Sequence, residues 1–320
     1  MGEQLLPNFG SCNLGSINIA NDCFYNKDGS FNYEELAATS DRIGQFLDNV
    51  GTVNVFPSPK FRQWYEDNRP VGAGIMGLHD AMLRRGILYQ SSEGIEFTES
   101  IMRCLAESAH KTSVRLGKER GTPKSCNFEE LEFRRNVTTT SIAPTGSISF
   151  IGNCSSSIEP VFSPETYRTD ERGEVYTLSH PYRNESFFTA TIGVDNAPSP
   201  EDHVIMQAKI QEYVDAGVSK TVNLPESATI EDVYNIYHLA WKMQCKGITV
   251  YRNNSREFQV LNDKKTADSN GGIKNFSTTS LPIIPLEVKD NPGCDGDCDI
   301  VKESGCKSCK ACGWSACSIA

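Results

Sequence analysis

The stretch Val137-Thr-Thr-Thr-Ser-Ile-Ala-Pro-Thr-Gly-Ser-Ile-Ser149 joins a run of β-branched residues to a turn rich in glycine and hydroxyl side chains. Its first half is typical of a buried strand, because β-branched residues fit a pleated sheet. The turn would expose backbone N–H groups and hydroxyls at the carboxyl end of that strand, and a helix that begins there favours an anion. A plain strand-to-loop turn is the alternative, since a Walker-type lysine is absent. The pattern predicts a strand over 137–143 and a candidate phosphate-binding turn over 144–149.

The segments around this strand indicate an α/β fold. Apolar residues recur at helical spacing in four segments, and short runs between them are typical of buried strands. The helical segments are 36–50, 97–109, 204–214 and 230–240, and the strands are 16–20, 137–143 and 247–251. Thr229 and Asp232 have the spacing of a capping box at the start of the last helix. Strands that alternate with helices favour a largely parallel sheet or barrel.

A second glycine-rich stretch, Gly72-Ala-Gly-Ile-Met-Gly77, matches the glycine pattern of dinucleotide-binding folds. Its context differs, because the preceding residues 64–70 do not read as a central strand. No acidic residue closes a second strand at the required distance either. We therefore expect a tight helix-packing turn at 72–77 rather than a nicotinamide site.

Composition limits the class of protein. With 320 residues, of which 38% are hydrophobic, the chain is long enough to bury a sizeable core. The formal net charge of −10 argues against a sequence-independent grip on nucleic acid, which needs a basic face. No apolar run approaches the roughly 20 residues that cross a bilayer, and the first residues lack a secretory signal. We expect a soluble, cytoplasmic protein without a nucleic-acid or membrane partner.

Half of the twelve cysteines lie within the last 27 residues. They are Cys294, Cys298, Cys306, Cys309, Cys312 and Cys317. In a reducing compartment such a cluster indicates metal binding or redox chemistry, and pairs at this spacing are typical of a zinc ribbon. A tetrahedral site uses only four thiols. The spacing leaves Cys306, Cys309 and Cys312 interchangeable as ligands.

We prefer the four ligands that leave the last two cysteines as an exchange-competent dithiol. The preferred zinc ligands are Cys294, Cys298, Cys306 and Cys309, and the dithiol is Cys312 and Cys317. Five scattered cysteines are expected to be small buried hydrophobes. These are Cys23, Cys104, Cys126, Cys154 and Cys245.

Three regions follow from these patterns. Residues 1–257 are expected to form one compact α/β unit. Residues 258–293 are polar and glycine-bearing and are expected to be a flexible linker. Residues 294–320 form the cysteine-rich, zinc-ribbon-like tail that the linker would carry.

Eight motifs occur in a fixed order along the chain. They are Gly2-Glu-Gln-Leu-Leu-Pro7, Ser11-Cys-Asn-Leu-Gly-Ser-Ile-Asn18, Arg69-Pro-Val-Gly-Ala-Gly-Ile-Met-Gly-Leu78, Ala143-Pro-Thr-Gly-Ser-Ile-Ser149, Ser155-Ser-Ser-Ile-Glu-Pro160, Ser219-Lys-Thr-Val-Asn-Leu-Pro225, Cys245-Lys-Gly-Ile-Thr-Val-Tyr-Arg252 and Cys312-Gly-Trp-Ser-Ala-Cys317. Together they resemble the large, catalytic chain of ribonucleotide reductases. The lone Tyr251 makes the class II, adenosylcobalamin-dependent type the closest resemblance, because iron-dependent relatives carry a tyrosine pair there.

The resemblance implies the second half of a ten-stranded α/β barrel, followed by the linker and the cysteine-rich tail. In the family a finger loop, Asn-Pro-Cys-Gly-Glu, carries the radical cysteine. Gly2 and Glu3 match the end of that motif, and Met1 stands where the cysteine should be. A thioether has no S–H hydrogen to lose. The resemblance thus implies a chain that is inactive without an N-terminal half, which would also hold most of the adenosylcobalamin site.

The resemblance also implies roles for individual residues. Glu3 would be the general base for the 3′-hydroxyl of a ribonucleoside di- or triphosphate. Cys12 would be one of the two thiols that reduce the 2′ position. Cys312 and Cys317 would re-reduce the resulting disulfide and be reset by a thioredoxin-like reductant. The implied substrate-binding residues are Gly2, Glu3, Pro144, Thr145, Gly146, Ser147, Ile148 and Ser149. A non-catalytic zinc-ribbon protein with a binding or regulatory role is the alternative.

Overall fold

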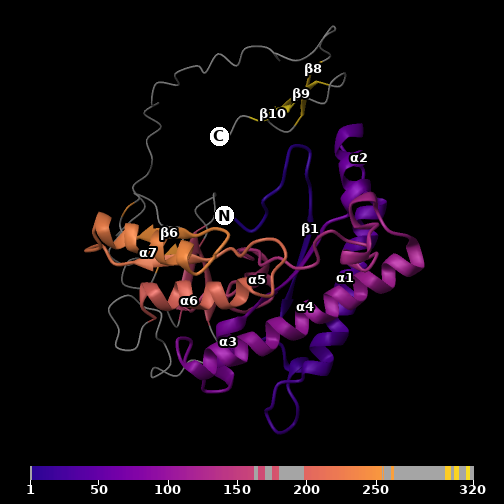
Figure 1. The fold of residues 1–320 in the computed structure, drawn as a ribbon. Helices are drawn as coiled ribbons and strands as arrows, with labels where there is room; N and C mark the ends of the chain where they lie inside the picture. The colour runs from indigo at the N-terminus through magenta and orange to yellow at the C-terminus, as the bar shows by residue number, and fades with distance from the viewer. Residues whose placement is uncertain are drawn as a thin grey trace.

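The computed structural model describes residues 2–161, 198–253 and 255, together with the backbone of six short strands elsewhere (Figure 1). These strands are β3 (Glu165–Thr169), β4 (Val175–Ser179), β7 (Leu261–Asn262), β8 (Ile300–Glu303), β9 (Cys306–Cys309) and β10 (Ser315–Cys317). The predicted linker 258–293 therefore lies outside the described residues except for β7. The side chains of the six tail cysteines lie outside them too.

Five parallel segments, bonded to one another in chain order, form the centre of the protein. Ala73 pairs in parallel with Thr140, and Ile142 pairs in parallel with Val218. These pairings join the two regular strand pairs, β1–β2 and β5–β6, into one ladder. In order, the segments are β1 (Asn13–Asn18), β2 (Val71–Met76), 138–142, 216–224 with β5 (Thr221–Leu224), and β6 (Thr249–Arg252).

The expectation of a turn at 72–77 is wrong, because this stretch forms β2 and its end. Every residue of β2 is buried, so the strand reads as a continuous small and apolar run without alternation. Gly74 has a packing reason, since a Cβ there would lie 2.2 Å from the carbonyl oxygen of Ser141. The glycines therefore allow two neighbouring backbones to approach closely.

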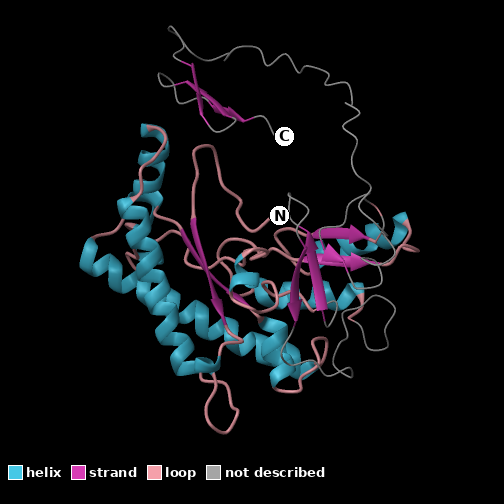
Figure 2. Cartoon of the chain, turned by 180° about the vertical axis from the view of Figure 1, so that it is seen from behind, coloured by secondary structure: helices cyan, strands magenta, loops and turns pink. Residues whose placement is uncertain are grey.

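Helices flank the ladder (Figure 2). The two longest, α1 (Tyr33–Val53) and α4 (Ser92–Arg120), pack together, and the Ser40 hydroxyl donates to the Leu105 carbonyl at 3.2 Å. The other helices are α2 (Pro59–Asn68), α3 (Leu78–Arg84), α5 (Ile148–Ile151), α6 (Pro200–Gln211) and α7 (Ile230–Lys242), with short 3-10 turns at Asp22–Phe24, Lys124–Cys126 and Glu129–Leu131. The four helices predicted from apolar spacing are all present.

Side-chain caps define where the later helices begin. Thr229 and Asp232 form the predicted capping box of α7. Ser199 and Asp202 form an equivalent box at α6, which the sequence analysis did not identify. Below α7, the side chains of Val222, Leu224 and Ile236 build a small apolar core that holds the helix on β5.

Two small antiparallel sheets lie outside the ladder. β3 pairs with β4 and with β7. The two residues of β7 lie within the predicted linker. In the tail, β9 pairs with β8 and β10. The register places Cys317 opposite Cys306.

Candidate active site

Cys12 lies directly before β1 and is half-buried. Burial raises the pKa of its thiol to about 12, and a hydrogen bond with the Thr138 side chain offsets part of that rise. Thr138 also donates through its hydroxyl to the Val71 carbonyl oxygen at 3.2 Å. At neutral pH Cys12 is therefore a protonated thiol, held beside the start of the third segment of the ladder.

Residues 2–4 lie across the third and fourth segments. The Glu3 carbonyl oxygen accepts from the Gly217 N–H at 2.9 Å and from the Ser141 hydroxyl at 3.2 Å. The Gln4 side chain donates to the same hydroxyl at 2.9 Å. Gly217 permits this approach, because a Cβ at that position would lie 2.1 Å from the Gly2 carbonyl oxygen. The half-buried Glu3 is thus anchored through its main chain.

The turn at 144–149 follows the third segment without a break. Thr145 has a φ of 54°, a left-handed conformation that is unusual for a β-branched residue. Its carbonyl oxygen accepts from the Ser149 N–H at 2.9 Å, and its hydroxyl accepts from the Ser157 N–H at 2.7 Å. Gly146, Ser147 and Ile148 are exposed, whereas Ser149 is buried. The turn therefore has a fixed inner side and an outer side that faces solvent.

Three predicted parts of the site lie along the single segment 138–149. Cys12 contacts Thr138, the Glu3 carbonyl contacts Ser141, and the turn begins at Pro144. Thr138 and Thr145 are seven residues apart, which is at most about 25 Å of extended chain. The predicted metal ligands and the tail dithiol lie outside the described residues. They are Cys294, Cys298, Cys306, Cys309, Cys312 and Cys317.

Sequence reasoning missed the residues that support these groups, namely Thr138, Ser141, Ser157 and Gly217. The signal available was the Thr-Thr-Thr-Ser run within 137–143, which places four neighbouring hydroxyl side chains on the predicted strand. Their partners range from 12 residues away along the chain, for Ser157 and Thr145, to 214 residues away, for Gly217 and Glu3, so only the three-dimensional structure identifies them.

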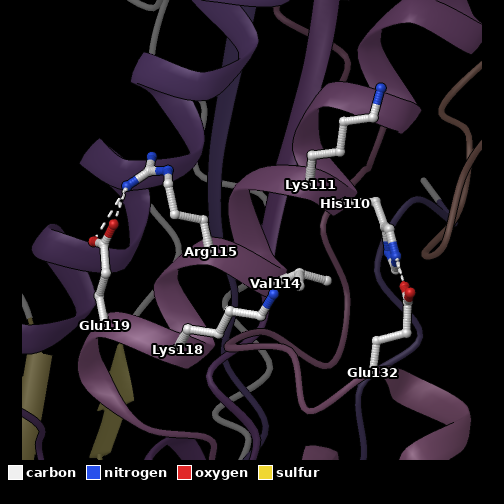
Figure 3. A pocket seen from close by; sticks show the side chains of 7 residues that line it. All are labelled: His110, Lys111, Val114, Arg115, Lys118, Glu119 and Glu132. Atoms are coloured by element: carbon white, nitrogen blue, oxygen red, sulfur yellow. Dashed lines mark hydrogen bonds and ion pairs between the residues drawn. The ribbon is translucent and has the colours of Figure 1, made fainter.

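A shallow cavity of about 460 Å³ lies elsewhere, on the face of α4 (Figure 3). Two of its basic side chains are paired, His110 with Glu132 and Arg115 with both Asp41 and Glu119. It contains none of the predicted site residues.

Among the side chains that the structure describes, no three of His, Cys, Asp and Glu gather as a metal site would require. None of the described helices has the length and apolar character of a membrane span.

The cysteines of 1–257 differ in accessibility. Cys126 and Cys154 are buried as expected, and Cys104 and Cys245 are half-buried, but the expectation for Cys23 is wrong. Cys23 is exposed because it lies in a short 3-10 turn at the surface. Iodoacetamide at pH 8 should therefore modify Cys23 well before Cys12, whose thiolate fraction at a pKa of about 12 is about 10⁻⁴.

Peptide mapping by mass spectrometry measures this order of labelling. Labelling in urea is the control, because unfolding should make the two rates similar. Cys12 labelling that matches Cys23 in the folded protein would show that Cys12 is not protected by burial.

Comparison with known proteins identifies the family. A family model described as ribonucleotide reductase, barrel domain, matches residues 2–135, 132–187 and 180–251. The vitamin B12-dependent ribonucleoside-diphosphate reductase of Thermoplasma acidophilum is 34% identical, over 93% of this chain and 43% of the relative. The protein of the same name from Mycobacterium tuberculosis is 36% identical, over 81% of this chain and 42% of the relative.

A more distant relative is the ribonucleoside-diphosphate reductase subunit alpha of Mycoplasma pneumoniae, which is 28% identical over 76% of this chain and 40% of the relative. The chain thus spans about two fifths of the length of these curated relatives. The family model covers most of the ladder, Glu3, Cys12 and the turn at 144–149. On this match the chain belongs to the ribonucleotide reductase family.

Proposed function

We propose that the chain is the C-terminal segment of an adenosylcobalamin-dependent ribonucleotide reductase, which converts ribonucleotides to 2′-deoxyribonucleotides for DNA synthesis. One observation carries the proposal: the segment 138–149 contacts Cys12 at its start, holds Glu3 in its middle and ends in the turn with the exposed outer side. The relatives named vitamin B12-dependent support the choice of cofactor. No residue of this chain is assigned to the cofactor itself, which supplies the initiating radical when bound.

The five-segment ladder would be one half of a ten-stranded barrel. Within the described part of the chain, β1 and β6 each pair on one side only. An open strand edge is unfavourable, because its backbone N–H and C=O groups lack hydrogen-bond partners in the sheet. The remaining five strands would come from the N-terminal half of the reductase, together with the radical cysteine.

The chemistry assigned to this chain is a two-electron reduction. The turn at 144–149 would hold the phosphates of a ribonucleoside di- or triphosphate through N–H groups and hydroxyls. Glu3 would accept the 3′-hydroxyl proton as the 2′-hydroxyl leaves as water. Cys12 and a cysteine of the other half would supply two hydrogens, so that ribonucleotide and two thiols give deoxyribonucleotide, disulfide and water. The protonated state of Cys12 suits a group that must deliver hydrogen.

The tail would complete the cycle. Cys312 and Cys317 would reduce the Cys12 disulfide by thiol exchange and be reset by a thioredoxin-like protein. Zinc bound by Cys294, Cys298, Cys306 and Cys309 would organise the tail at 294–320, and the linker at 258–293 would carry it. The cytoplasm, which keeps thiols reduced, suits this cycle, and the six cysteines of 1–257 are free thiols.

Co-production with the N-terminal part of the Thermoplasma acidophilum relative tests the proposal. With adenosylcobalamin and dithiothreitol, the complex should convert CDP or CTP to the deoxynucleotide. Glu3→Gln should lower kcat by about 10²-fold or more, because general base catalysis contributes that much. Glu34→Gln is the matched control, since Glu34 lies in the first turn of α1. Absence of deoxynucleotide with both substrates, in a complex that assembles, would contradict the proposal.

A further inference from the structure

An ion pair between a buried lysine and a half-buried glutamate joins two of the sequence motifs beside the turn. The Lys220 ammonium, with a fully buried side chain, donates to Glu159 Oε2 at 2.5 Å. Glu159 Oε1 accepts from the Thr221 N–H at 2.7 Å. A buried lysine needs such a partner, because its charge has lost its water. The role proposed above for Glu3, Cys12 and the turn makes no use of this pair.

The pair fixes the loop 154–161 to the fourth segment of the ladder. Both oxygens of Glu159 bind residues of that segment, at Lys220 and Thr221. The Lys220 ammonium also lies 5.8 Å from the centre of the Tyr89 ring, and the Tyr89 hydroxyl donates to the Ile158 carbonyl at 2.8 Å. The loop is therefore held from two sides at adjacent residues.

The same loop forms the inner wall of the turn. The Ser157 N–H donates to the Thr145 hydroxyl at 2.7 Å, and the Ser149 and Ser156 hydroxyls lie 2.8 Å apart. Thr145 and Ser157 are both left-handed, with φ values of 54° and 49°. Left-handed residues other than glycine persist only where their surroundings hold them in place. If the loop 154–161 shifted, Thr145 would lose this support and the turn would change its conformation.

From this chain of contacts we infer that Glu159 and Lys220 are positioning residues for the nucleotide phosphates. They act through the loop, which holds Thr145 in its left-handed conformation and so sets the direction of the exposed residues 146–148. The inference rests on the proposed function of the turn. It assigns to the Ser-Ile-Glu-Pro and Ser-Lys-Thr motifs a shared role in the affinity for a nucleoside diphosphate.

The double variant Glu159→Gln/Lys220→Met tests the inference in the reconstituted complex. Glutamine keeps an acceptor for the Thr221 N–H, and methionine keeps the volume of the lysine side chain. Replacing both members of a buried pair is often neutral for stability. The dissociation constant and the KM for CDP should rise about tenfold, while kcat stays within about threefold and the melting midpoint stays within a few degrees.

The matched control is Lys209→Met/Glu212→Gln, which removes an exposed pair with an N–O distance of 3.1 Å. Its affinity for CDP should stay within about twofold of the wild type. Unchanged CDP affinity in the Glu159/Lys220 double variant, with a wild type that binds and turns over CDP, overturns the positioning role and leaves the function intact. A wild type that neither binds nor reduces CDP or CTP overturns the function, and this inference with it.

Discussion

Replacement of Asp48 by alanine should lower the free energy of unfolding by about 3–5 kcal/mol. The Asp48 side chain is fully buried in α1, and its carboxylate accepts from Arg69 and Arg120 at 2.8 Å and from Arg135 at 3.3 Å. Only 8% of the Arg69 side chain is exposed. Removing the one carboxylate leaves three guanidiniums facing each other without a counter-charge. A loss of that size is a large fraction of the stability of an ordinary domain.

Acid should reproduce part of this effect. Burial alone would raise the pKa of Asp48, but the Arg69 guanidinium, with Arg135 and Arg120, holds it below its ordinary value. The folded pKa is thus lower than the unfolded one. The carboxylate therefore contributes stability above the unfolded pKa of about 4, and the contribution is lost as the pH falls through the folded pKa.

Urea unfolding followed by circular dichroism measures the change for Asp48→Ala. The matched control is Asp41→Ala in the same helix. The Asp41 carboxylate binds Arg115, and 46% of the Asp41 side chain is exposed. It should cost less than about 1 kcal/mol. Equal losses in the two variants would show that Asp48 is not the centre of the arginine cluster.

The Asp48 cluster also shows where sequence reasoning stops. Its three arginines lie 21, 72 and 87 residues away along the chain. No periodicity links residues at such distances. The α7 capping box was predictable, because Thr229 and Asp232 act within one helical turn. The same contrast separates the turn at 144–149, which composition indicated, from Gly217 and Ser157, which support it from other segments.

β2 illustrates the reverse difficulty. Its glycines suggested a turn, because glycine weakens an isolated strand. The structure uses them for close contact, as a Cβ at Gly72 would lie 2.7 Å from the Ser141 Cβ. This need exists only once the third segment lies beside β2. Local propensity therefore gave the helices correctly, and it failed where the packing of neighbouring strands decides the conformation.

Cys12→Ser should abolish multiple turnover in the reconstituted complex, with a loss on the order of 10³-fold or more in kcat. The reduction needs two hydrogens from two thiols, and a serine hydroxyl does not form the disulfide that stores the oxidation. Neither dithiothreitol nor a thioredoxin-like protein should restore the rate, because each acts only on that disulfide. The Thr138 hydroxyl beside Cys12 should bind the serine equally well, so CDP affinity should not change.

Cys23→Ser is the matched control, because Cys23 is the exposed thiol among the described cysteines and lies outside the proposed site. Its kcat should stay within about twofold of the wild type. Steady turnover by Cys12→Ser would remove Cys12 from the reduction and would require another thiol near the segment 138–149. Among the described cysteines, Cys12 is the one with a hydrogen bond to the Thr138 side chain. Because the proposed reaction takes its hydrogens from a thiol at this place, its electron balance depends on Cys12.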